Sequence, residues 1–131
     1  MTQSFGIAVK GLIQNPEGKY LIIYKSDLDE VNPNDFDIPG GRINRGEKIE
    51  DALHREIKEE VGLKVVIQKL NNTRGFTKEE LHLVGITFLA TCSDYEHITL
   101  SHEHTGFQRR TKEEILNGDF PAWLKEEFQK I

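Results

Sequence analysis

Apolar runs separated by turn-forming residues open the chain, and this pattern predicts strands. Residues 5–13 are rich in aliphatic side chains, and residues 19–25 (KYLIIYK) form a second apolar run. Between the two runs lies QNPEG at residues 14–18, where proline and glycine are placed for a turn. The start of the chain therefore predicts a β-hairpin.

A helix is predicted over residues 47–61, which contain no proline or glycine and consist mainly of helix formers. Gly62 and Leu63 follow as a left-handed C-terminal cap and its apolar neighbour. Other patterns predict strands at 65–70 and 82–91, shorter strands at 97–100 and 107–109, and helices at 112–116 and 121–129. Strands before and after a central helix indicate one mixed α and β domain over residues 1–131.

Two glutamates break the amphipathic pattern of the predicted helix. At about 100° per residue from Glu56, Glu60 falls at about 40°, inside the apolar stripe, and Glu56 lies on its edge. The stripe itself is formed by Ile49, Leu53, Ile57 and Val61. A buried ionised carboxylate needs a cationic partner. Because residues four apart lie one turn apart, Glu56 and Glu60 can converge on one hard cation, and Glu59 can reach a second.

The same segment also fits a solvated helix face with ordinary ion pairs, such as Arg55 with Glu59. Likewise, Pro39-Gly40-Gly41 is a common turn and Gly62 a common helix cap. Neither of these interpretations explains an acid pair that faces inward.

The complete spacing from Gly41 to Leu63 favours a catalytic interpretation. Gly41 is followed by five residues and Glu47, then by seven residues and the stretch Arg55-Glu56-Ile57-Lys58-Glu59-Glu60-Val61-Gly62-Leu63. This sequence resembles the Nudix box, the signature of the Nudix hydrolase family, with every defining position filled. The preceding stretch at residues 36–40 also resembles the strand and turn that lead into the box. Beyond these residues, the resemblance is one of layout only.

The resemblance implies an α+β fold in which a mixed β-sheet is sandwiched between α-helices. It also implies an enzyme that cleaves a diphosphate bond in a nucleoside diphosphate derivative and uses Mg²⁺ or Mn²⁺. This chemistry suits the composition, because an acidic protein binds a polyphosphate best through bridging cations held by carboxylates. Metals also lower the pKa of bound water and neutralise charge on the transferring phosphoryl group.

The resemblance further implies roles for individual residues. Glu56 and Glu60 would be the principal metal ligands and Glu59 an additional one, and Glu56 is also a candidate for orienting or deprotonating water. Arg55 would hold the carboxylates in register by pairing with Glu47 or a helix acid. Gly40 and Gly41 would bring the loop backbone close enough for a carbonyl oxygen to join the metal ligands, so alanine there should impair activity.

Further candidates lie outside the box. Glu103, within SHEHTGFQRR, is expected to be an additional ligand or base of the kind that this family often uses, and Glu79 is a weaker rival. His102 and His104 alternate with Glu103 and so share one face of an extended segment, as in a metal site. Surface histidines are nevertheless the more frequent outcome.

Three cations and three aromatic residues are candidates for binding substrate. Arg42, Arg45 and Lys25 flank the box loop and are expected phosphate contacts, with ordinary solvated surface as the alternative. Candidates for stacking on a base are Phe5, Phe76 and Trp123, although aromatic side chains belong to cores more often than to binding sites.

Composition and charge exclude several other classes. The formal net charge of −5 argues against long nucleic acid as a partner. No apolar run approaches the length of a membrane span, and the start of the chain lacks the pattern of a secretory signal. The single Cys92 allows no intramolecular disulfide, so a cytoplasmic setting is expected. Many relatives form dimers, which makes a homodimer an open expectation.

The residues outside the box leave the substrate open. The proline that tends to accompany ADP-ribose preference and the tyrosine of dinucleoside polyphosphate hydrolases are both absent, as are longer motifs of members that cleave NADH or coenzyme A. This favours a (deoxy)nucleoside triphosphate pyrophosphohydrolase, with ADP-ribose or a nucleoside diphosphate sugar as the alternative substrate. A non-catalytic nucleotide-sensing module is the alternative of another class. A prenyl-type diphosphate isomerase would need a catalytic cysteine, and Cys92 fits a buried strand position better.

Overall fold

Two long strands run side by side through the middle of the sheet. In the computed structural model, which describes residues 4–25, 35–78, 80–93 and 97–131, β1 (Ser4–Gln14) and β6 (Leu81–Thr91) pair in parallel along their whole length. On the other side of β6, β5 (Val66–Lys78) pairs with it antiparallel and forms one edge. Parallel and antiparallel pairs therefore occur in one mixed sheet, as expected.

Four shorter strands complete the sheet beside β1. The end of β1 pairs with the start of β2 (Tyr20–Lys25), which in turn pairs with β3 (Phe36–Asp37) and β7 (His104–Arg110). The earlier part of β1 pairs with β4 (Gly40–Arg42). In the predicted hairpin between β1 and β2, the Asn15 side chain accepts hydrogen bonds from two backbone N–H groups. The strand order places β3, β4 and β7 close to one another around β1 and β2.

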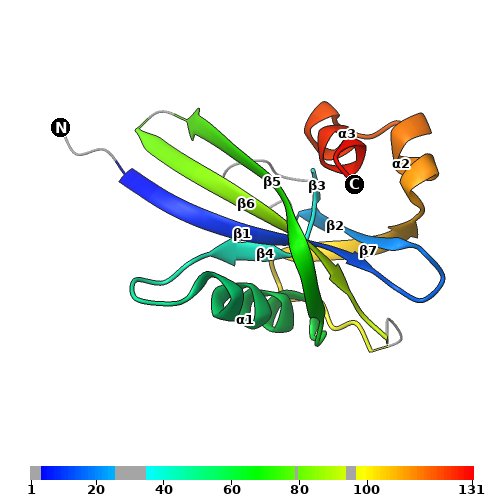
Figure 1. Cartoon of the computed structure of the whole chain (residues 1–131), viewed down its shortest axis with the longest axis horizontal. Helices are drawn as coiled ribbons and strands as arrows, with labels where there is room; N and C mark the ends of the chain where they lie inside the picture. Colours follow the sequence, from blue (N-terminus) through cyan, green and yellow to red (C-terminus); the bar gives the residue numbers. More distant parts are fainter. Residues whose placement is uncertain (1–3, 26–34, 79, 94–96) are drawn as a thin grey trace.

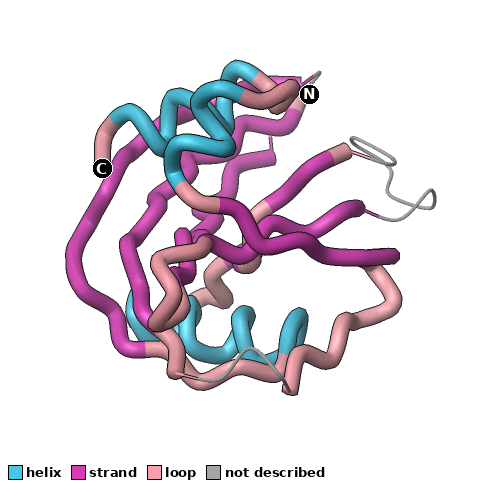
Figure 2. The backbone as a smooth tube through the Cα atoms, turned by 90° about the vertical axis from the view of Figure 1, so that its right-hand side faces the viewer, coloured by secondary structure: helices cyan, strands magenta, loops and turns pink. Residues whose placement is uncertain are grey.

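Helices cover both faces of the sheet (Figures 1 and 2). One face carries α1 (Ile49–Val61), and the other carries α2 (Lys112–Asn117) and α3 (Ala122–Gln129). Side chains of β1 face both sides of the sheet. Val9 and Ile13 pack with α1, whereas Leu12 packs with α2 and α3. This confirms the predicted sheet sandwiched between helices.

Some details of the sequence prediction are wrong. β5 continues to Lys78, well beyond the predicted end at residue 70, because it stays paired with β6 throughout. Residues 97–100 are described but form no strand. The helix begins at Ile49, close to its predicted start, but Ile49 is 41% exposed instead of belonging to the core stripe. Its position in the first turn places it at the margin of the core.

The other end of α1 follows the prediction. Gly62 is in the left-handed conformation (φ 74°), and its backbone N–H donates to the carbonyl oxygen of Lys58. The helix buries Leu53, Ile57 and Val61, and with them Glu60. A buried glutamate in the apolar stripe is the feature that the periodicity predicted.

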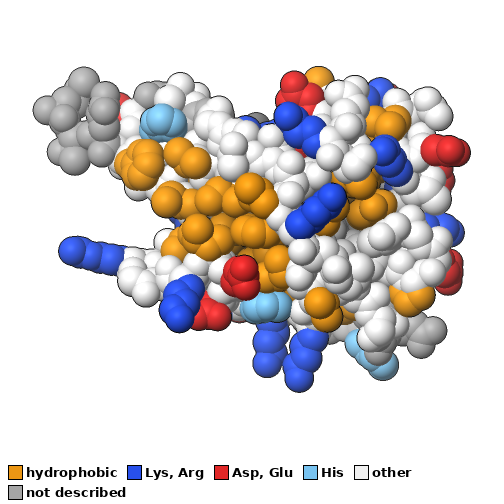
Figure 3. All heavy atoms as spheres, in the orientation of Figure 1, with side chains coloured by type: hydrophobic (Ala, Val, Ile, Leu, Met, Phe, Trp, Pro, Cys, Tyr) orange, Lys and Arg blue, Asp and Glu red, His pale blue; other side chains and the backbone are white. Residues whose placement is uncertain are grey.

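The surface also carries apolar side chains. Figure 3 shows hydrophobic side chains gathered above α1, over the strands that form the left half of the view. Large hydrophobic residues with high exposure in the described part of the chain include Phe5 at 67% and Leu70 at 53%. No helix among the described residues is long and apolar enough to cross a membrane.

Candidate functional site

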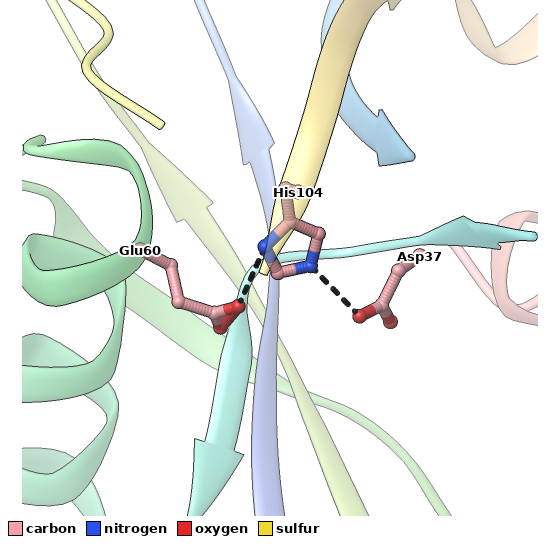
Figure 4. A group of neighbouring side chains, drawn as sticks. All are labelled: Asp37, Glu60 and His104. Atoms are coloured by element: carbon pink, nitrogen blue, oxygen red, sulfur yellow. Dashed lines mark hydrogen bonds and ion pairs between the residues drawn. The ribbon is translucent and has the colours of Figure 1, made fainter. Parts of the chain in front are cut away.

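Three buried titratable side chains from three elements meet beside the box helix (Figure 4). Asp37 comes from β3, Glu60 from α1 and His104 from β7. The Nε2 atom of His104 lies 3.4 Å from Oδ2 of Asp37, and its Nδ1 atom lies 3.4 Å from Oε2 of Glu60. One ligand atom from each of the three residues lies within 4.8 Å of the others, so the group is compact enough to hold a metal ion.

Lys10 of β1 supplies a positive charge to this cluster. Its ammonium donates to Oδ1 of Asp37 at 2.9 Å and to the carbonyl oxygen of Ile38 at 3.3 Å. Burial opposes the charge on Lys10, but attraction to Asp37, Glu60 and Glu56 raises its pKa. Lys10 therefore stays charged, and it lies near box carboxylates as well as Asp37.

The pKa values of the two buried carboxyl groups, Asp37 and Glu60, are shifted in opposite directions. Burial alone would raise the pKa of Asp37, but the Lys10 ammonium and the hydrogen bond with His104 outweigh it and hold that pKa well below its usual range. Burial raises the pKa of Glu60 to about 7, although Lys10 and the Gly40 N–H partly oppose this shift. The charge on Glu60 is thus less well compensated than the charge on Asp37.

The two glycines before the box bring the backbone against its carboxylates. The Gly40 N–H donates to Oε1 of Glu60 at 2.8 Å. Gly40 has φ of 149°, and a Cβ there would lie 2.0 Å from the carbonyl oxygen of Val9, so only glycine fits. At Gly41 a Cβ would lie 2.4 Å from Oε2 of Glu56. Gly41 thus leaves the room that the Glu56 carboxylate occupies.

Arg55 holds several box residues together, as predicted for its pairing. Its Nε and Nη2 atoms donate to Glu47 at 2.7 and 2.9 Å, and Nη1 donates to Glu56 at 2.8 Å and to Glu59 at 3.3 Å. Nη2 also donates to the carbonyl oxygen of Arg42 at 3.1 Å. Hydrogen bonding from Arg55 lowers the pKa of Glu47 to about 2. The guanidinium therefore fixes Glu56 relative to the loop before the helix.

A cavity of about 320 Å³ opens on the α3 side of the sheet, next to the acid cluster. Lys10 and Asp37 line it as well as belonging to the cluster, and Lys25 lines it from the end of β2. The Arg74 guanidinium lies 4.9 Å above the ring of Trp123 at another wall. The lining of the cavity therefore combines an aromatic ring with the buried charges of Lys10 and Asp37.

Glu127 of α3 lines the cavity and is held by a hydrogen-bond network. This carboxylate is fully buried, and it accepts hydrogen bonds from the Thr87 hydroxyl at 2.6 Å and from the amides of Asn71 and Asn72 at 3.1 Å each. The network ties α3 to β5 and β6, so the wall that carries Trp123 is anchored to the sheet.

The other described residues predicted from the sequence to belong to the site lie outside the buried cluster. Glu59 is largely exposed and pairs with Arg55, and Arg42, Arg45, His102 and Glu103 are exposed. Phe5 is exposed and makes an edge contact with His82, so it lies outside the cavity that Trp123 lines. Glu79 and the side chain of Phe76 fall outside the described residues. Cys92 is buried beside the α1 core, as expected, but it follows the last residue of β6 and does not lie in the strand.

Two members of the cluster, Lys10 and Asp37, were not singled out from the sequence as functional. A sequence signal exists for Lys10, because it is a charged residue in the middle of the apolar run of β1. His104 was a candidate, but its burial next to exposed His102 and Glu103 became visible only in the structure.

Comparison with known proteins agrees with this geometry. Residues 4–130 match the sequence model of the NUDIX domain. The chain belongs to the NUDIX family. Hydrolases of the NUDIX family generally use divalent metals, and the buried Glu60 carboxylate beside Gly40 offers oxygen atoms of the kind that such cations bind.

Relatives within the NUDIX family include nucleoside triphosphatases. The nucleoside triphosphatase NudI of Escherichia fergusonii is 36% identical over 107 residues, covering 73% of this chain and 74% of that protein. Among solved structures, a MutT protein from Methanosarcina mazei Go1 has a TM-score of 0.88 at 27% identity, covering 98% of this chain and 94% of that one. A C. elegans Ap4A hydrolase has a TM-score of 0.79 at 20% identity, covering 95% and 93%, and this likeness shows the fold alone.

Proposed function

We propose that this chain is a metal-dependent pyrophosphohydrolase that converts a (deoxy)nucleoside triphosphate into a nucleoside monophosphate and inorganic diphosphate. The observation that carries the proposal is the packing of the Gly40-Gly41 backbone against the carboxylates of Glu60 and Glu56. Similarity to the nucleoside triphosphatase NudI supports the choice of substrate.

Mg²⁺ or Mn²⁺ is the proposed cofactor. Glu56, Glu59 and Glu60 would hold it, with backbone oxygens of Gly40 and Gly41. The donor set fits, because oxygen ligands suit these hard cations and the raised pKa of Glu60, about 7, marks a buried carboxylate short of positive charge. When bound, the cation neutralises phosphate charge and acidifies bound water.

The residues of the chain would then orient water and substrate for hydrolysis. The water oxygen forms a bond to phosphorus while the bond from that phosphorus to the bridging oxygen breaks, and the bridging oxygen leaves with the diphosphate. Glu56, held by Arg55 at 2.8 Å, is the proposed acceptor of the water proton. Glu103 precedes buried His104 and is exposed, and we propose it as a further acid that contacts the water or the cation.

Substrate binding is assigned to the cavity and the cations around it. The volume of about 320 Å³ suits a small ligand. Trp123 would contact the base, and Lys25 would meet the phosphates where the cavity approaches Asp37. Arg42 and Arg45, exposed at the box loop, are proposed contacts for the outer phosphates.

A substrate panel tests the proposal. Canonical and oxidised nucleoside triphosphates, ADP-ribose, nucleotide sugars and dinucleoside polyphosphates are incubated with Mg²⁺, Mn²⁺ or chelator, and phosphate and diphosphate release are measured separately. We expect diphosphate from a nucleoside triphosphate, only with metal. Glu113→Gln is the matched control for box variants, because Glu113 is an exposed glutamate of α2.

Other outcomes of the panel contradict the proposal in different ways. Turnover of ADP-ribose or a nucleotide sugar alone would overturn the substrate but keep the reaction class. If nothing on the panel is hydrolysed while one nucleotide raises the melting temperature, the chain is a nucleotide-sensing module.

A further inference from the structure

His104 has a buried ring nitrogen with no hydrogen bond. The side chain is only 3% exposed, and its Nδ1 atom has no hydrogen-bond partner although Oε2 of Glu60 lies 3.4 Å away. An unsatisfied buried polar atom is rare in folded proteins and calls for a specific explanation. The unpaired nitrogen points at a buried carboxylate, as Figure 4 shows.

Asp37 determines which ring nitrogen carries the proton. Oδ2 of Asp37 lies 3.4 Å from Nε2, and the carboxylate keeps its charge because Lys10 binds its other oxygen at 2.9 Å. A charged carboxylate only accepts hydrogen bonds, so Nε2 must carry the proton in the neutral ring. When Glu60 is ionised, Nδ1 then presents a lone pair toward the lone pairs of Glu60. Two electron-pair donors that face each other are stabilised by a cation between them.

The separation of the two donors suits a metal ion. Zinc bonds to histidine nitrogen and carboxylate oxygen are about 2.1 Å long, so donors 3.4 Å apart would subtend an angle of roughly 110° at the metal. This is close to the tetrahedral angle. The charge balance agrees for a neutral imidazole, because the two buried carboxylates, when both ionised, then face one ammonium in the cluster.

We propose that Nδ1 of His104 and Oε2 of Glu60 bind a divalent transition metal such as Zn²⁺, with Asp37 orienting the imidazole through Nε2–H. Imidazole suits Zn²⁺, whereas Mg²⁺ prefers oxygen ligands alone. Carboxylates that hold the second ring nitrogen of a metal-binding histidine commonly fix its orientation. Because Glu60 is also a ligand in the proposed function, the inference rests on that function for one of its two donors.

The test uses the full-length chain and Zn²⁺ without nucleotide. The wild-type protein is labelled with ¹⁵N at histidine, its rings are assigned through the backbone, and the imidazole nitrogens are followed by NMR during the titration. We expect the Nδ1 resonance of His104 to shift on binding. Calorimetry on His104→Gln should show a loss of Zn²⁺ affinity of more than roughly tenfold. His102→Gln, an exposed histidine two residues away, is the matched control and should bind normally.

The wild-type NMR result decides the question even where His104→Gln fails to fold. Zn²⁺ binding that leaves the His104 nitrogens unshifted, or no Zn²⁺ binding, overturns the inference. Mg²⁺-dependent release of diphosphate is measured on the same preparation. Hydrolysis with an unresponsive His104 would leave the proposed function standing, whereas a shifted His104 without hydrolysis would refute the function and keep the metal site.

Discussion

Gly41→Ala should abolish most activity without unfolding the protein. A Cβ on Gly41 would lie 2.4 Å from Oε2 and 2.5 Å from Cδ of Glu56, whereas ordinary contact begins at 3.4 Å. The carboxylate must therefore move by about 1 Å. Because Glu56 ends in a flexible side chain, the fold can accommodate this movement, but Glu56 loses its position beside the loop.

The size of the effect follows from the displacement. A misplacement of about 1 Å at a reacting group costs on the order of 100-fold in rate, which corresponds to about 2.7 kcal/mol of transition-state stabilisation. The cost in stability is bounded by the Glu56 and Arg55 ion pair, which is partly exposed and contributes about 1 kcal/mol or less. Steady-state kcat/KM with a nucleoside triphosphate, alongside urea unfolding, measures both quantities.

Gly40→Ala is the informative comparison. There the added Cβ meets the backbone carbonyl of Val9 at 2.0 Å, and φ is 149°, so the variant should lose about 3 kcal/mol of unfolding free energy or more. A Gly41→Ala enzyme with normal kcat/KM, or one destabilised as much as Gly40→Ala, would refute the argument that Gly41 makes room for the Glu56 carboxylate.

Substitutions of Glu60, Arg55 and Glu103 give three further tests. In chelator, folding raises the pKa of Glu60 from 4.5 to about 7, so the unfolding free energy falls by about 3 kcal/mol as the pH rises from 4.5 to about 7. The difference in unfolding free energy between wild type and Glu60→Gln at pH 4.5 and 8 measures this, and a constant difference would contradict it. Arg55→Lys cannot reproduce the forked contacts to Glu47 and Glu56, so kcat should fall at least tenfold while the melting temperature changes little; an unchanged kcat would show that the guanidinium is dispensable. Glu103→Gln should lower kcat by roughly 100-fold with unaltered stability, and a rate equal to that of Glu113→Gln would remove Glu103 from the site.

Local patterns predicted the features that depend on local physics. The amphipathic stripe predicted that Glu60 would be buried, and Gly62 predicted the end of α1. The polar stretch NNTRGFT did not indicate a strand, yet β5 runs through it because β6 pairs with it. Tertiary pairing here overrides weak local propensity.

The composition of the buried cluster depends on the topology. Lys10, Asp37 and His104 are far apart in the sequence, and only the arrangement of β1, β3 and β7 brings them together. Which of His102, Glu103 and His104 turns inward depends on where β7 begins, and it begins at His104. Sequence periodicity places alternating residues on one face but does not tell which face is buried.

Product analysis of Glu60→Gln with one nucleoside triphosphate and Mg²⁺ tests the central claim most directly. We expect wild type to release nucleoside monophosphate and inorganic diphosphate in equal amounts. Glu60→Gln, folded as judged by its melting temperature, should lose this turnover by at least roughly 100-fold while Glu113→Gln retains it. Two results would contradict the proposed function. One is release of inorganic phosphate while nucleoside diphosphate accumulates, and the other is near-normal turnover by Glu60→Gln.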